Sequence, residues 1–148
     1  MDAVILIPGE GREILLGPVR VTVQEDGAHT RGTFGLAEFA FPPHAPAPPP
    51  HVHHAHEEGF YILEGELEFL VGGESIHVGQ GTFILVPIGV AHSFGNPTDR
   101  PARFLNTFTP PRYLGYFEEM SRQIAASGPL NPSQTRELMA HYETDVVV

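Results

Sequence analysis

Four histidines and two glutamates fall within eight consecutive positions, from His51 to Glu58. This chain has no cysteine. A transition metal would therefore have to be bound by imidazole and carboxylate groups. Residues two apart in a strand point to the same face, so His51 and His53 point together. His54 and His56 have the opposite parity, and we expect them to face solvent or the rim of a site. Taken alone, the segment fits a metal site and a histidine-rich exposed loop equally well.

A second pattern lies downstream, in Gly-Thr-Phe-Ile-Leu-Val-Pro-Ile-Gly-Val-Ala-His-Ser-Phe-Gly-Asn. Gly81 is followed by Pro87 after five intervening residues, and Gly89 is followed by His92 after two more. Asn96 comes after another three residues. A pair of imidazoles can hold one ion only if further ligands close the site, and this segment offers another histidine.

Together the two segments resemble the cupin superfamily. The first motif of that family has the form His-x-His, four residues, Glu, six residues, Gly. These positions are occupied here by His51, His53, Glu58 and Gly65. The second motif is matched in full register, and the two motifs span 46 positions with 15 residues between Gly65 and Gly81. The flanking strands extend the resemblance up to Phe108. The chain departs from the family pattern where prolines replace the glycine that usually opens the first motif, which alters the entry loop and touches no ligand.

The resemblance implies an all-β fold, a double-stranded β-helix of the jelly-roll type (the cupin barrel), with one divalent metal inside it. Carried over by position, the metal ligands are His51, His53, Glu58 and His92. Glu58 is chosen over Glu57 because six residues separate Glu58 from Gly65. Fe, Mn, Ni, Co, Cu and Zn all accept imidazole and carboxylate ligands, so the identity of the ion stays open.

The segments that must position these residues are short apolar or alternating runs broken by Gly, Pro and Asp, which is typical of strands and turns. We expect strands at residues 14–16, 19–24, 33–41, 59–63, 66–71, 74–78, 82–86, 92–96 and 102–107. Gly72 and Gly73 predict a tight hairpin between two of them. The stretch from Pro42 to Pro50 holds six prolines in nine residues and is expected to be a stiff lead-in to the histidines.

The pattern changes after Phe108. Apolar residues take helical spacing over residues 113–127, and Asn131, Pro132 and Gln134 resemble an N-cap, an N1 proline and a capping box. We therefore predict a single domain over residues 1–148, with a β core at about 14–108 and a short helical tail at about 112–142.

Composition excludes several classes of function. A formal charge of −10 argues against nucleic acid and anionic membrane surfaces as partners. The basic residues are all arginine, which excludes lysine Schiff-base chemistry and a P-loop lysine. The first residues lack the features of a secretory signal, and no apolar run is long enough to span a membrane, so we expect a cytoplasmic protein.

Inward positions predict the walls of a cavity. If Glu58 points inward, residues of the same parity on its own strand and on the neighbouring strands also point inward. The predicted substrate pocket consists of Phe60, Ile62, Phe94, Phe104 and Asn106. An apolar, partly aromatic pocket suits a small organic ligand. The same aromatic residues are equally what the core of a small β-fold requires.

Within the superfamily, the segment Pro-Pro-Pro-His-Val-His and the residues that follow it are most similar to small single-domain cupins akin to bacterial quercetin 2,4-dioxygenases. This likeness implies a metal-dependent dioxygenase that opens a flavonol-type ring, with Glu58 as ligand and proton acceptor. Two alternatives stay open: a non-catalytic cupin that binds a small ligand as a sensor or scaffold, and an isomerase or lyase that needs no O₂. Small cupins of this kind are commonly dimers, and apolar residues on both faces of residues 60–63 and 82–86 also predict a homodimer.

Overall fold

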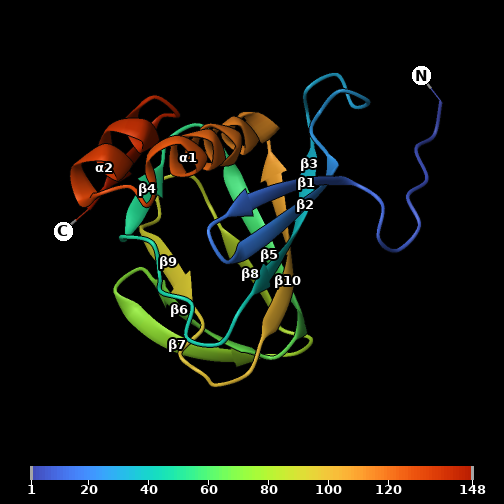
Figure 1. The fold of residues 1–148 in the computed structure, drawn as a ribbon. Coiled ribbons are helices and arrows are strands. Elements are labelled where there is room, and N and C mark those ends of the chain that lie inside the picture. The colour runs from blue at the N-terminus through green and yellow to red at the C-terminus, as the bar shows by residue number, and fades with distance from the viewer. Residues whose placement is uncertain (1, 148) are drawn as a thin grey trace.

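The computed structural model describes residues 2–147. Two antiparallel β-sheets face each other, and two helices lie across one end of them (Figure 1). The first sheet has the order β1 (Arg12–Leu16), β2 (Val19–Glu25), β3 (Gly35–Phe41), β10 (Ala102–Thr109), β5 (Glu57–Glu64) and β8 (Phe83–Val86). The second sheet has the order β11 (Thr144–Val146), β4 (His51–His53), β9 (His92–Gly95), β6 (Glu66–Val71) and β7 (Glu74–Gly79). This arrangement confirms the predicted double-stranded β-helix.

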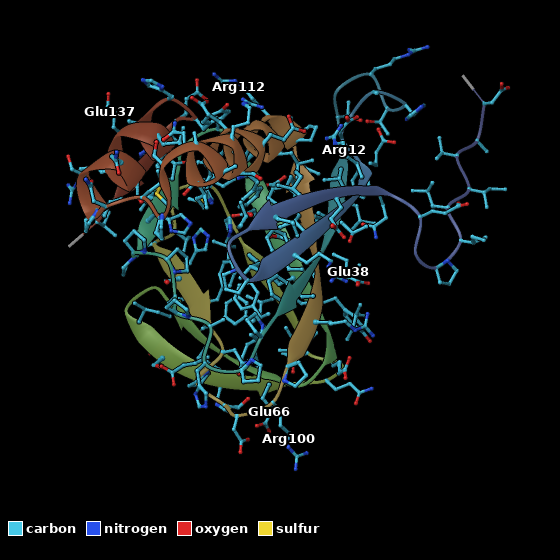
Figure 2. The ribbon with its side chains drawn as sticks, viewed as in Figure 1. Arg12, Glu38, Glu66, Arg100, Arg112 and Glu137 are labelled. Atoms are coloured by element: carbon cyan, nitrogen blue, oxygen red, sulfur yellow. The ribbon has the colours of Figure 1, made fainter. Side chains whose placement is uncertain are left out.

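Aromatic side chains fill the space between the sheets. β3 and β10 are neighbours in the first sheet, and their residues alternate between buried and half-buried positions, as strands with one inward face do. Phe39 and Phe104 pair across these strands, with stacked rings 5.2 Å apart. Phe60 of β5 meets Phe69 of β6 at 5.1 Å and joins the two sheets. The labelled charged side chains lie at the outside of the molecule (Figure 2).

Glycines at two turns explain how the strands of the site are connected. Gly72 and Gly73 have φ values of +56° and +87° and join β6 to β7, which confirms the predicted hairpin. Gly65, which ends the first motif, has a φ of +77° between β5 and β6. A Cβ at this position would clash with the carbonyl oxygen of Pro101, so a larger residue does not fit.

The helical tail covers one end of the sandwich. It consists of the 3₁₀ turn η1 (Pro111–Tyr113), helix α1 (Leu114–Ser127) and helix α2 (Pro132–Ala140). Phe117 of α1 packs edge-on against Phe39 at 5.3 Å, and Asn131 and Gln134 form the predicted capping box of α2. Among residues 2–147, no helix is long and apolar enough to cross a membrane.

Two short strands were not among the predicted ones. The histidine run itself forms β4, and β11 follows the helices and pairs with β4 in antiparallel register. The C-terminal residues therefore return to the second sheet and place Thr144 opposite His53.

Candidate metal centre

The four side chains that resemble cupin metal ligands come together at the end of the sandwich that the helices cover. His51 and His53 lie on β4, His92 on β9 and Glu58 on β5 of the opposite sheet. One ligand atom from each of these four residues lies within 4.8 Å of the others, and all four residues are buried. His51 and His92 are direct partners across β4 and β9, so strand register fixes their spacing.

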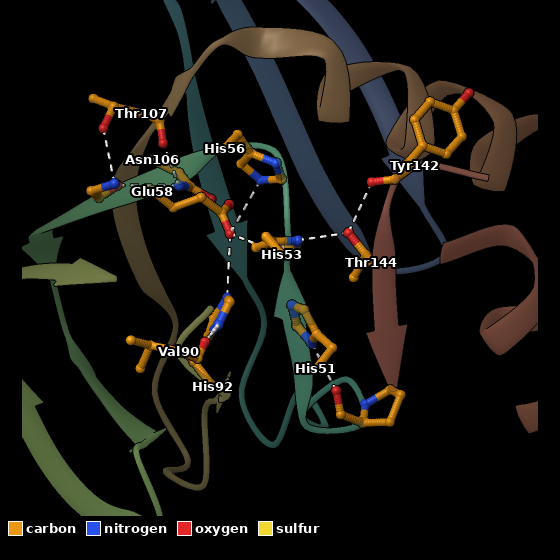
Figure 3. A network of polar contacts seen from close by, with 12 residues as sticks. His51, His53, His56, Glu58, Val90, His92, Asn106, Thr107, Tyr142 and Thr144 are labelled. Carbon is orange, nitrogen blue, oxygen red and sulfur yellow. Dashed lines mark hydrogen bonds and ion pairs between the residues drawn. The ribbon is translucent and has the colours of Figure 1, made fainter. Parts of the chain in front are cut away.

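Each of the three imidazoles is held through its Nδ1 atom (Figure 3). His51 Nδ1 lies 2.8 Å from the carbonyl oxygen of Pro49, and His92 Nδ1 lies 3.2 Å from that of Val90. A carbonyl oxygen only accepts, so both nitrogens donate and carry a proton.

His53 Nδ1 is fixed by a side chain instead. It lies 2.8 Å from Thr144 Oγ1, and this hydroxyl donates its own proton to the carbonyl oxygen of Tyr142 at 3.0 Å. Thr144 can therefore only accept from His53, which places the proton of His53 on Nδ1 as well. Partners of this kind set the tautomer and the orientation of metal-binding histidines.

Protons on Nδ1 leave the Nε2 atoms of neutral imidazoles with lone pairs. Burial lowers the pKa of His53, and burial together with the neighbouring His92 and His53 lowers the pKa of His51 to about 3. His51 and His53 are therefore neutral at pH 7.

Glu58 faces these lone pairs. Its Oε2 atom lies 2.6 Å from His53 Nε2 and 3.3 Å from His92 Nε2. Burial by itself would raise the pKa of Glu58, whereas hydrogen bonds from Nε2 protons of His53, His56 and His92 would hold that pKa well below its usual range, so an ionised carboxylate here needs positive charge facing it. A carboxylate and nitrogen lone pairs at this distance repel one another unless a cation lies among them. The donor set thus fits one divalent ion that accepts imidazole and carboxylate ligands.

The two remaining histidines of the run differ from each other. His54 is exposed and contacts Asp145 at 3.0 Å, as its parity predicts. The prediction for His56 was wrong, because this side chain is 4% exposed and stands 3.8 Å from Glu58 Oε2 through its Nε2 atom. Strand parity does not apply to it, since β4 ends at His53 and the chain turns before β5 begins at Glu57.

A cavity of about 340 Å³ opens onto this cluster and reaches His51 and Glu58. This volume lies at the small end of the range for ligand pockets. The aromatic and sulfur-containing side chains on its wall are Phe39, Phe41, Phe94, Tyr113, Tyr116, Phe117, Met120 and Met139. Burial raises the pKa of both tyrosines, so their phenols stay protonated and the wall adds no charge to that of Glu58.

Of the residues predicted to line a substrate pocket, Phe94 lies on the wall of this cavity. Phe60, Ile62 and Phe104 are fully buried in the packed core, where Phe60 and Phe104 lie 5.9 Å apart. Asn106 is also buried, and its Nδ2 donates to the carbonyl oxygen of Gly59 at 3.1 Å. These four residues belong to the packed core and are not on the wall of the cavity.

The cavity residues that the sequence did not predict come from β1, β2, β3, the proline-rich segment at 46–49, η1 and the two helices. Phe39 and Phe41 share the inward face of β3, and this alternation was a signal that could have found them. Tyr113 and Met120 follow the last long strand, and no local pattern predicts that their segment folds back over the site.

Comparison with known proteins agrees with the fold. Residues 37–108 match the family model described as Cupin domain. An uncharacterized protein of Streptomyces coelicolor is 36% identical over 58 residues, which are 39% of this chain and 54% of that protein. The quercetin 2,3-dioxygenase of Bacillus subtilis is 30% identical over 90 residues, which are 61% of this chain and 26% of that enzyme. The matched part is thus about half of the first relative and about a quarter of the second.

Among solved structures, the polyketide cyclase RemF from Streptomyces resistomycificus superposes with a TM-score of 0.64 at 23% sequence identity. The match covers 73% of this chain and 80% of that chain. At this level of identity the likeness is one of fold.

Proposed function

The chain belongs to the cupin superfamily, and from this premise we propose that it is a metal-dependent enzyme acting on a small aromatic molecule as a quercetinase-like dioxygenase. The observation that carries the proposal is the position of His51 and Glu58 at the inner end of an aromatic cavity. The histidine lone pairs and the carboxylate there would hold the metal, and the cavity would hold the organic molecule.

The residues around the cavity have two roles, binding of the ligand and transfer of a proton. Apolar and aromatic walls favour a planar ring system over a sugar, because a sugar would lose its hydrogen bonds to water without replacement. Glu58 is ionised at neutral pH, and it could accept a proton from a ligand hydroxyl that the bound ion makes more acidic. When bound, the ion supplies Lewis acidity and free coordination positions for an oxygen-bearing ligand and O₂.

The similarity to the Bacillus subtilis enzyme supports the choice of reaction class. That protein is named a quercetin 2,3-dioxygenase, and its match with this chain is 90 residues long. The activity of this chain is our proposal, since the match covers 26% of that enzyme.

The proposal is tested by loading the metal-free protein separately with Fe, Mn, Ni, Co, Cu and Zn and measuring O₂ uptake with quercetin in an oxygen electrode. We expect uptake in step with loss of the flavonol absorbance for at least one metal. Glu58→Gln should abolish the uptake, whereas His54→Ala, at a neighbouring exposed position, should leave it unchanged.

The other outcomes identify the alternatives. Tight binding of quercetin that is recovered unchanged would favour a non-catalytic cupin, and conversion of a ligand without O₂ would favour an isomerase or lyase. If the protein retains none of the metals, the premise of a metal enzyme fails.

We further propose that the protein is a homodimer that associates through the outer face of β5 and β8. β8 is the last strand of its sheet, and Tyr61, Phe83 and Leu85 are 45%, 62% and 55% exposed on this face. An apolar edge strand of this kind needs cover. Light scattering should give twice the mass of one chain for the wild type and the mass of one chain for a Phe83→Glu, Leu85→Lys variant. A wild-type mass of one chain at micromolar concentration would refute the dimer.

A further inference from the structure

His56 is a buried histidine that has no role among the four metal-ligand candidates. Its ring packs against the ring of His53, at 4.1 Å, and against that of Tyr113, at 5.0 Å, and those two rings also contact each other at 4.5 Å. Its Nε2 atom is buried and has no hydrogen-bond partner among residues 2–147. A buried nitrogen without a partner destabilises a protein by about 1–3 kcal/mol, so its retention here calls for a ligand or a partner that completes it.

Glu58 Oε2 lies 3.8 Å from this nitrogen (Figure 3). The same oxygen faces His53 and His92, but both of those histidines have their proton on Nδ1, held by Thr144 and by the carbonyl oxygen of Val90. An imidazole whose single proton is held on Nδ1 has no N–H left to donate to Glu58.

His56 differs because no backbone carbonyl or hydroxyl among the described residues fixes its Nδ1. Its proton is therefore free to lie on Nε2. Of the three histidines that face Glu58 Oε2, His56 is the one that can present an N–H to it.

We propose that His56 is a positioning residue for Glu58, whose Nε2–H hydrogen-bonds the carboxylate and holds it in place to bind the metal. The inference rests on the metal site of the proposed function and adds a fourth histidine to it. A shift of less than 1 Å in the Glu58 carboxylate brings the two atoms to hydrogen-bonding distance of about 3 Å. The stacked ring of Tyr113 packs against His56 at 5.0 Å and helps to hold its orientation.

The test compares the affinity of the full-length protein for Co²⁺, measured by competition with a chelating dye, in variants matched for shape. His56→Phe keeps a ring against Tyr113 and removes the N–H, whereas His56→Gln keeps an N–H donor. His54→Phe is the control, because His54 lies two residues away and is exposed.

We expect His56→Phe to weaken Co²⁺ binding by about 10- to 100-fold, as for other partners of metal ligands, and to shift the visible absorption of the bound ion. His56→Gln should bind within a few fold of wild type, and His54→Phe should match wild type. In a Glu58→Gln background, His56→Phe should have no further effect, since its action passes through the carboxylate.

Three results would overturn this inference. Equal affinities of wild type and His56→Phe would show that the N–H is not used, and an equal loss in the Phe and Gln variants would show that the ring packs without positioning Glu58. A wild type that binds no Co²⁺ would overturn the metal site itself and this inference with it. Thermal unfolding of the metal-free variants checks that they fold, and His56→Leu replaces His56→Phe if that variant does not.

Discussion

Thr144 offers the most informative single perturbation of the metal centre, because it reaches His53 from 91 residues away in sequence. Thr144→Val keeps the β-branched shape and removes the hydroxyl that accepts from His53 Nδ1 at 2.8 Å. Thr144 is 1% exposed, so water cannot replace the hydroxyl. Leaving a buried N–H without its partner costs about 1–3 kcal/mol.

A change of tautomer at His53 would avoid this cost. The proton can move to Nε2, where Glu58 Oε2 lies 2.6 Å away and accepts it. In that tautomer the proton of His53 has a hydrogen-bond partner in the metal-free protein, but Nε2 no longer has a lone pair with which to bind the ion. We therefore expect metal affinity to fall by about 10- to 100-fold, which equals about 1.4–2.7 kcal/mol, while the stability of the metal-free protein changes less.

The assay is chelator competition for Co²⁺ or Zn²⁺, with urea unfolding of the metal-free protein alongside. Thr144→Ser keeps the hydroxyl and should restore most of the affinity. Thr22→Val makes the same change on the half-buried face of β2 and should have no effect. Wild-type affinity in Thr144→Val, or an equal loss in Thr144→Ser, would refute the tautomer argument.

Two further predictions concern pH and the cavity. The pKa of His51 is about 3 in the folded protein against 6.5 as a reference, so the unfolded chain binds more protons between these values and the metal-free protein should lose stability as pH falls from about 6.5 towards 3. The depressed pKa of Glu58 adds a loss of the same sign below about 4.5; urea midpoints from pH 7 to 4 should fall steadily, and a flat profile would contradict the burial of these groups. Met120→Trp should fill part of the cavity and weaken quercetin binding at least about ten-fold without changing metal affinity. It also introduces the first tryptophan of the chain, whose fluorescence reports the ligand, and unchanged ligand affinity would place the ligand elsewhere.

Several local features could be predicted because a few neighbouring residues determine them. Gly72 and Gly73 supply the positive φ values of the hairpin, and Asn131 and Gln134 satisfy the free N–H groups at the start of α2. The spacing of the two motifs also indicated which histidines and which glutamate the fold would bring together.

The buried position of His56 could not be predicted from strand alternation. Alternation predicts the direction of a side chain only while the backbone stays extended, and β4 ends three residues before His56. The turn between β4 and β5 directs the ring inward, against Tyr113, and no parity rule applies across it.

The sequence by itself therefore determined the class of fold, the local turns and caps, and the four residues that resemble metal ligands. The tertiary structure decided which protons those residues carry, because Thr144 meets His53 through the pairing of β11 with β4. It also decided the shape of the cavity, whose walls come from the first three strands, the proline-rich segment, η1 and both helices. Contacts between segments far apart in sequence depend on how the whole core packs, and no local pattern of residues contains that information.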